Sequence, residues 1–251
     1  MDKVRKLSPS RENSRSSEEV VKRPELQNEN VTFTLEDSMR LIQQSFMMRP
    51  DSTAQGTVAV AAMAAYWNEK SGVPAFTYNV SLGMPMGTMA ISMRSESMAA
   101  YSAVVWPMMA DPEFQRLRNE VNACLAVPSE VVMWQVLHVV GQMPTVPSTL
   151  VQQITLRTTN PGAISWGIDI ANHASSLIGR PVVVAGTTYG SALVATPANS
   201  LSFFTYWDDV AQIDEAGPKL QIDAEYARLQ SLAVGLIDQS FMTSIVARRS
   251  N

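Results

Sequence analysis

The sequence has few of the residues that proteins use for crosslinking or for binding metals. Its 251 residues include one cysteine and two histidines. A single cysteine excludes an internal disulfide framework and a thiolate zinc cluster within one chain, and two histidines leave little for a metal site. We therefore expect no metal centre and no other cofactor.

Charged residues are also scarce, at 17% of the chain against roughly 25% in an average soluble protein. The formal net charge of −4 does not indicate a polyanion partner for the molecule as a whole. A surface poor in Lys, Glu, Arg and Asp loses little desolvation energy when another protein covers it. The composition therefore favours association with further copies of the chain or with other proteins.

The sequence contains no apolar segment suited to a membrane. No apolar signal region follows Met1, and the longest nearly uncharged stretch, residues 54–67, is too short and too rich in Ala and Gly to span a bilayer. We expect an intracellular protein without a membrane partner, located in the host cytoplasm and in an assembled particle if it is viral.

Residues 1–30 differ in composition from the rest of the chain. They contain almost no large apolar side chains and are dense in Ser, Arg, Glu and Asn. Such a segment cannot bury enough surface to offset the entropy that ordering removes. The sequence predicts a disordered N-terminal arm over residues 1–30 and one folded domain over residues 31–251.

Helical signals dominate the predicted domain. The strongest start signal is Asp111-Pro112-Glu113, because Asp caps a helix, Pro suits its first position and Glu complements its dipole. Apolar spacing, caps and breakers predict helices over residues 35–49, 52–71, 93–106, 112–127, 129–140, 149–157, 163–178 and 219–249.

Two segments of the predicted domain do not show a helical pattern. Residues 73–93 are predicted to form a loop with at most a short strand, because glycines and a proline interrupt their alternation. The second segment is the one near residues 182–196, where we expect one β-hairpin.

No internal repeat is detectable. We expect a mainly α fold, a single helical domain with this one hairpin.

No motif or residue group indicates catalysis. The sequence has no nucleophile elbow, phosphate loop or dinucleotide-binding motif. His138 lies in an apolar run typical of a core or interface position, and His173 has only Asp169 one helical turn away. Cys124 is expected to act as a small hydrophobe, and Asp208-Asp209 to start a helix or solvate the surface. We therefore expect no catalytic residue and a protein that is not an enzyme.

Arginine is retained in the predicted domain although lysine is nearly absent. Lys70 and Lys219 are the only lysines of residues 31–251. Arginine binds phosphate in bidentate geometry and tolerates partial burial. If arginines converge, they form a groove that follows a phosphate backbone, and the alternative is scattered, solvated arginines. The best candidates for nucleic-acid contacts are Arg94, Arg116, Arg157 and Arg180.

Methionine is abundant. The chain has fifteen methionines, and many of them lie within residues 47–109. Thioether side chains adapt to irregular contacts, which suits a repacking protein interface as well as the filling of gaps in a core. The sequence leaves these two uses open.

These features predict a self-assembling structural protein. The layout is similar in outline to that of coat proteins of filamentous RNA viruses. The hypothesis is a viral coat or nucleocapsid subunit that polymerises into a filament or shell through its arms. It would package single-stranded nucleic acid, RNA in particular, by sequence-independent phosphate contacts. The alternatives are a helical adaptor that binds proteins through a Met-rich surface, and an enzyme or binder with a site around His173, Asp169 and Asp208.

Overall fold

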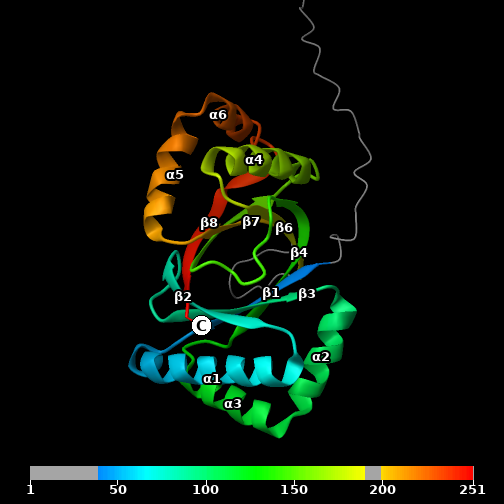
Figure 1. Cartoon of the computed structure of the whole chain (residues 1–251), viewed down its shortest axis with the longest axis vertical. Coiled ribbons are helices and arrows are strands. Elements are labelled where there is room, and N and C mark those ends of the chain that lie inside the picture. Colours follow the sequence, from blue (N-terminus) through cyan, green and yellow to red (C-terminus); the bar gives the residue numbers. More distant parts are fainter. Residues whose placement is uncertain (1–38, 190–198, 251) are drawn as a thin grey trace, which may run out of the picture. The chain divides into compact units, whose positions relative to one another are not determined.

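The computed structural model describes residues 39–189 and 199–250. Contacts divide the chain into units of residues 1–32 and 33–251, and all described residues belong to the second unit. The arm predicted over residues 1–30 lies outside the described residues, as does part of the hairpin predicted near residues 182–196. The described residues form a closed antiparallel β-barrel with helices on its outside (Figure 1).

Eight strands and six α-helices make up the described part of the chain. The first half contains β1 (Arg40–Met47), α1 (Thr53–Ser71), β2 (Ala75–Leu82), β3 (Thr88–Ser95), α2 (Met98–Ala110), α3 (Pro112–Cys124) and β4 (Glu130–Val140), with a 3-10 turn at Pro50–Ser52. The second half contains β5 (Leu150–Thr158), α4 (Ala163–Ile178), β6 (Val182–Tyr189), β7 (Ser200–Trp207), α5 (Val210–Ile222), α6 (Ala224–Ser231) and β8 (Ile237–Arg249).

The two halves of the fold have the same topology. Around the barrel the strands follow the order β1-β3-β2-β8-β5-β7-β6-β4. Each half therefore has its fourth strand beside its first, then its third, then its second, which is the ferredoxin-like order of a β-α-β-β-α-β unit. In each half two helices connect the third strand to the fourth. The halves are joined by the antiparallel pairs β2–β8 and β4–β6.

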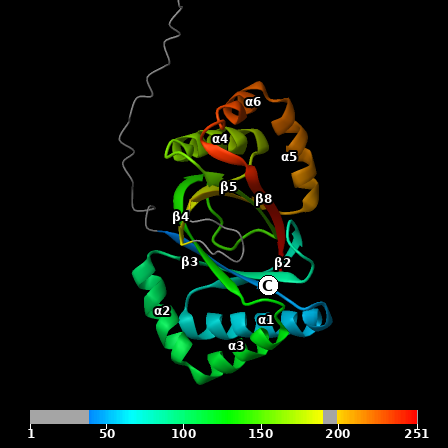
Figure 2. The ribbon, with the colours of Figure 1, turned by 180° about the vertical axis from the view of Figure 1, so that it is seen from behind.

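Two helix layers cover the outside of the barrel. In the first layer, α1 and α3 bury Trp67 and Phe114 against Phe46 of β1 and its neighbours. In the second layer, α4 buries Trp166 against Leu201 of β7. Figure 2 shows the same two layers from behind, with α1, α2 and α3 on one side and α4, α5 and α6 on the other. No helix of the described part is both long and apolar enough to cross a membrane.

The prediction of a mainly α domain is wrong. Three predicted helices, over residues 35–49, 129–140 and 149–157, contain β1, β4 and β5, and the last part of the predicted helix over 219–249 is β8. In β1 and β4 apolar residues occupy both the face toward the helices and the face toward the barrel interior, so the alternation that marks a strand is weak. In β1, Leu41 faces the interior and Ile42 faces the helices, and both are buried.

Other segments follow the sequence more closely. Helices predicted over residues 52–71, 112–127 and 163–178 correspond to α1, α3 and α4. By contrast, the loop predicted over residues 73–93 contains β2 and most of β3. The strand β6 begins at Val182, and its hairpin partner is β7, which lies beyond the predicted range of 182–196.

The methionines of residues 47–109 serve mainly to fill the first helix layer. Five of them are buried in its core, namely Met48, Met63, Met89, Met93 and Met108. Met86, in the turn between β2 and β3, is 96% exposed. For those five residues the structure therefore decides in favour of core packing.

Gly83 provides a test of the seam between β2 and β8. Its φ is +85°, and a Cβ at this position would lie 1.9 Å from the backbone oxygen of Ser244 in β8. We expect Gly83→Ala to lower the free energy of unfolding by roughly 2–3 kcal/mol, measured by urea denaturation, because strain and a backbone clash add.

Gly72 is the matched control, since its φ is +69° and a Cβ there would meet nothing within 4 Å. The strain alone predicts a loss of about 1 kcal/mol for Gly72→Ala. Equal losses for the two variants would contradict the close approach of the β2–β3 turn to β8.

Candidate functional site

The interior of the barrel contains a cavity of about 310 Å³. Alternate residues of most strands face it, for example Leu41, Gln43 and Ser45 of β1, because successive side chains of a strand point to opposite faces. Both halves contribute to its lining. Its volume lies within the range of roughly 300–1,000 Å³ that is usual for small-molecule sites.

Aromatic rings form part of the cavity wall. Trp134 of β4 and Phe204 of β7 meet edge to face, with ring centroids 5.8 Å apart and an interplanar angle of 81°. Both line the cavity, together with Phe76 of β2. Such walls provide flat apolar surface and ring edges, which suit a flat aromatic ligand.

A chain of polar side chains crosses the interior. Gln43 Nε2 of β1 donates to Gln153 Oε1 of β5 at 3.1 Å, and Trp134 Nε1 donates to Gln43 Oε1 at 3.3 Å. Gln153 Nε2 in turn donates to the hydroxyls of Thr155 and Ser202, both at 3.1 Å. Since β1 and β5 are the first strands of their halves, the amide pair links corresponding strands of the two halves.

Arg94 is the charged residue of this site. Among the residues that line the cavity, it alone carries a charge. Its Nη1 donates to the carbonyl of Pro144 at 2.7 Å, whereas its Nη2 is buried without a hydrogen-bond partner in the described part of the chain. Burial raises the pKa of the Tyr206 and Tyr78 phenols. The Arg94 charge acts against that rise at both phenols, and at Tyr206 a side-chain hydrogen bond with Arg94 acts in the same direction. Both phenols are therefore neutral hydrogen-bond donors near pH 7.

A second cavity, of about 290 Å³, lies between the sheet of the first half and its helices. It is lined by aromatic and thioether side chains, including Trp67, Tyr101 and Met109. At its edge Arg118 Nη1 lies 3.6 Å from Met109 Sδ. This second cavity provides a control site against which the barrel cavity can be compared.

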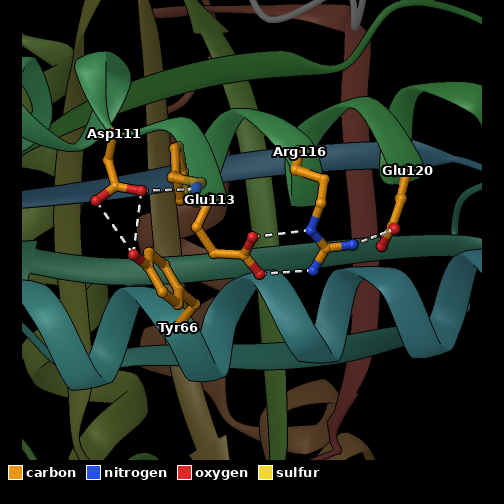
Figure 3. A network of polar contacts seen from close by, with 6 residues as sticks. Tyr66, Asp111, Glu113, Arg116 and Glu120 are labelled. Atoms are coloured by element: carbon orange, nitrogen blue, oxygen red, sulfur yellow. Dashed lines mark hydrogen bonds and ion pairs between the residues drawn. The ribbon is translucent and has the colours of Figure 1, made fainter.

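The structure places the four arginines predicted to contact nucleic acid in different parts of the fold. Arg94, on β3, lies in the barrel cavity. Arg116, on α3, lies between two carboxylates of its own helix (Figure 3): Glu113 accepts from its Nε and Nη2 at 2.8 and 2.6 Å, and Glu120 accepts from Nη1. The hydrogen bonds to Glu113 are the main cause that raises the pKa of Arg116.

The other two predicted arginines belong to the second half. Arg157 Nη1, on β5, is 3.6 Å from Asp238 Oδ2, and the guanidinium lies 4.7 Å from the ring centre of Phe241. Arg180, after α4, donates to Asp208 Oδ2 at 2.8 Å. No two of the four arginines share a hydrogen-bond partner in the described residues. Phosphate contacts for them stay a prediction.

Both histidines lie outside the barrel cavity. His173 Nε2, on α4, is 2.7 Å from Asp223 Oδ1 rather than paired with Asp169. Asp223 also caps α6 by accepting from the backbone nitrogen of Tyr226 at 2.7 Å, so the contact ties α4 to α6. His138 Nε2, on β4, is 3.2 Å from Asn172 Oδ1.

Two smaller expectations are confirmed. Cys124 is buried in the apolar core of the first helix layer, and Asp209 caps α5 by accepting from the backbone nitrogen of Gln212 at 3.0 Å.

Across residues 39–189 and 199–250, no three His, Cys, Asp or Glu side chains gather closely enough to hold a metal ion.

The sequence did not reveal most of the cavity residues. Gln43, Trp134 and Gln153 lie in segments predicted as helices, and Tyr78 lies in the predicted loop. A reading of these segments at period two would have placed Leu41, Gln43 and Ser45 on one face. The arginine of the site was selected only for its residue type.

No protein-family model and no curated protein matches this chain. Solved structures share its fold. A protein from Fusobacterium nucleatum subsp. nucleatum, provisionally named a monooxygenase, is 9% identical, with 85% of this chain and 93% of that chain covered and a TM-score of 0.61. An anthrone oxidase-like protein is 12% identical, with 87% and 94% covered and a TM-score of 0.60. A provisionally named monooxygenase from Lactobacillus acidophilus is 8% identical, with 85% and 95% covered and a TM-score of 0.55.

At these identities the similarity shows the fold alone, a barrel of two ferredoxin-like halves shared with proteins that carry enzyme names. The prediction of a viral coat or nucleocapsid subunit is therefore wrong, as is the prediction that the chain is not an enzyme. The first prediction assumed a mainly helical assembly domain that the chain does not form, and the second relied on the lack of a known catalytic motif in the sequence. The expected self-association, RNA partner and intracellular location stay predictions.

Gln153 allows a test of the polar chain. We expect Gln153→Met to lower the free energy of unfolding by about 1–3 kcal/mol, because it leaves Gln43 Nε2 without its acceptor and removes the amide donor from the hydroxyl pair of Thr155 and Ser202. Gln152→Met, one residue earlier on β5 and outside the cavity lining, is the control and should change stability by less than about 0.5 kcal/mol. Equal losses in urea denaturation would exclude a special role for Gln153.

The His173–Asp223 contact predicts a dependence of stability on pH. The hydrogen bond from His173, followed by the one from Tyr226, lowers the pKa of Asp223. A carboxyl with a lowered pKa stabilises the fold above its unfolded pKa of about 4, and this stabilisation is lost as the pH falls through the folded pKa. We expect Asp223→Asn, which keeps a capping residue, to be less stable than the original chain at pH 7.

The free energy of unfolding of Asp223→Asn should approach that of the original chain as the pH drops from 5 to below the folded pKa of Asp223. Urea denaturation at each pH measures this difference. Asp169→Asn, which removes another carboxylate near His173 in sequence, serves as the control. A difference that stays constant over this pH range would show that the charge of Asp223 contributes nothing.

Proposed function

We propose that the chain is an oxidising enzyme, of the oxidase or monooxygenase kind, that binds one small aromatic molecule in the barrel cavity. The observation that carries the proposal is this cavity of about 310 Å³, whose aromatic walls surround a few convergent polar groups. The fold supports it, because proteins named as monooxygenases and as anthrone oxidase-like have the same barrel.

The cavity residues have separable roles in such a reaction. Trp134 and Phe204 set the plane in which a flat ring lies. The hydrogen bonds of Gln43 to Gln153 and Trp134 hold that wall in one arrangement. The surrounding strands exclude water from the ligand, which strengthens polar contacts made inside the barrel.

The reaction can be balanced for an anthrone-type compound. Conversion of its ring methylene to a carbonyl removes four electrons, and one dioxygen molecule accepts them. One oxygen atom then forms the new carbonyl, and the other leaves as water with the two methylene hydrogens. The protein's part is to bind the ring, orient it and keep bulk water away.

The proposal predicts oxygen uptake that depends on the barrel cavity. We expect the full chain to consume dioxygen with some member of a panel of fused-ring aryl ketones and phenols that includes anthrone. Label from ¹⁸O₂ should appear in the product by mass spectrometry. Ser92→Phe, which fills the barrel cavity from β3, should lower the rate by roughly tenfold or more because the ring is displaced.

Ser129→Phe is the matched control, since Ser129 is also half-buried and lines the second cavity instead. It should leave the rate within about twofold of the original chain. Loss of activity in Ser129→Phe alone would move the site to the second cavity. Binding of panel compounds without any oxygen uptake would leave a ligand-binding protein and overturn the oxidising function.

A further inference from the structure

The polar groups of the barrel cavity are unbalanced in charge. The lining includes Arg94 and no Asp, Glu, Lys or His. We propose that Arg94 binds an oxyanion carried by an aromatic ligand, a ring carboxylate or a phenolate, so that the cavity selects aromatic anions. This inference rests on the proposed function, because it names the class of molecule that the same cavity takes.

Arg94 differs from Arg116, Arg157 and Arg180 in having no carboxylate partner in the described residues. Arg116 is paired with Glu113, and Arg180 with Asp208. Arg94 donates from Nη1 to a neutral carbonyl, that of Pro144, and its buried Nη2 has no partner in the described part of the chain. A buried guanidinium donor without an acceptor is costly, and a ligand oxygen would remove that cost.

Neutral phenols lie beside this guanidinium. Tyr206 comes from the second half and Arg94 from the first, and a hydrogen bond between their side chains joins the two halves in the interior. Tyr78 of β2 lies within reach of both. Phenols that stay protonated donate hydrogen bonds and so add to the binding of an oxyanion. A ligand oxygen at Arg94 would therefore meet several donors at once.

A second arginine increases the positive charge of this region. Arg249 of β8 is the cross-strand partner of Tyr78 and acts on its phenol electrostatically. Its Nη1 donates to the carbonyl of Pro147, which lines the cavity, so it too has a carbonyl rather than a carboxylate as partner. Besides the phenol of Tyr206, which acts on Tyr78, the groups that act electrostatically on these two phenols are arginines, with no Asp or Glu among them. A ligand anion would supply the missing negative charge.

Two ligands of the same shape test the proposal. 1-Naphthoate carries a carboxylate, and 1-naphthamide is its neutral counterpart. Isothermal titration of the full chain should show naphthoate bound at least about tenfold more tightly than naphthamide. Arg94→Gln should bring the two affinities together, and Arg94→Lys should restore part of the preference because it restores the charge.

Two further variants keep the result interpretable. Arg116→Gln, on α3 outside the barrel, should leave the preference for naphthoate unchanged. Tyr206→Phe should reduce that preference by a few fold without changing naphthamide binding. Thermal unfolding of each variant tests whether the fold is retained. If Arg94→Gln does not fold, the change in naphthoate preference of Tyr206→Phe tests the oxyanion site instead.

The outcomes separate this proposal from the one on which it rests. Equal affinity for the two ligands in the original chain, or a preference that survives Arg94→Gln, overturns the oxyanion site and leaves the aromatic cavity in place. Failure of both ligands to bind also overturns the oxyanion site. In either case, oxygen uptake with the panel of aryl ketones and phenols decides the oxidising function independently.

Discussion

Closure of the sheet is the constraint on which the rest of the structure depends. Two pairings make it, β2 with β8 and β4 with β6, and both contain register shifts. Without them, four strands would present unpaired edges, and the interior would be open to water. The β2–β8 pairing also sets Tyr78 opposite Arg249. The electrostatic character of the cavity is therefore a product of closure and does not belong to either half alone.

Local signals were sufficient for several helices and insufficient for most strands. The stop of α1 at Gly72 and of α4 at Gly179 follows from glycines with positive φ, and the start of α3 follows from the cap at Asp111. The strand β4 carries apolar residues on both faces, which removes the alternation that marks a strand. Strand partners are far apart in sequence, so no local pattern predicts which strands pair. The duplicated topology likewise leaves no detectable repeat in the sequence.

The candidate site could be anticipated only in one respect. Arginine in a lysine-poor domain predicted phosphate contacts, which stay a prediction, and among the four candidate arginines Arg94 lines the barrel cavity. Those surroundings come from strands of both halves, and the phenol of Tyr206 reaches Arg94 only because β7 lies across the barrel from β3. Residue type therefore drew attention to Arg94, while the cavity around it depends on tertiary structure.

The position of β8 has a consequence for how the chain is made. It is the last strand to be synthesised among those described, yet it lies between β2 and β5, and Asn79 meets Ser250 across 171 positions of sequence. Until β8 emerges from the ribosome, β2 has a bare edge and the barrel interior is exposed. Pairings of such long range form slowly, and unpaired edges bind other chains. Nascent chains of this protein thus pass through a stage in which the edges of β2 and β5 are open to pairing with other chains.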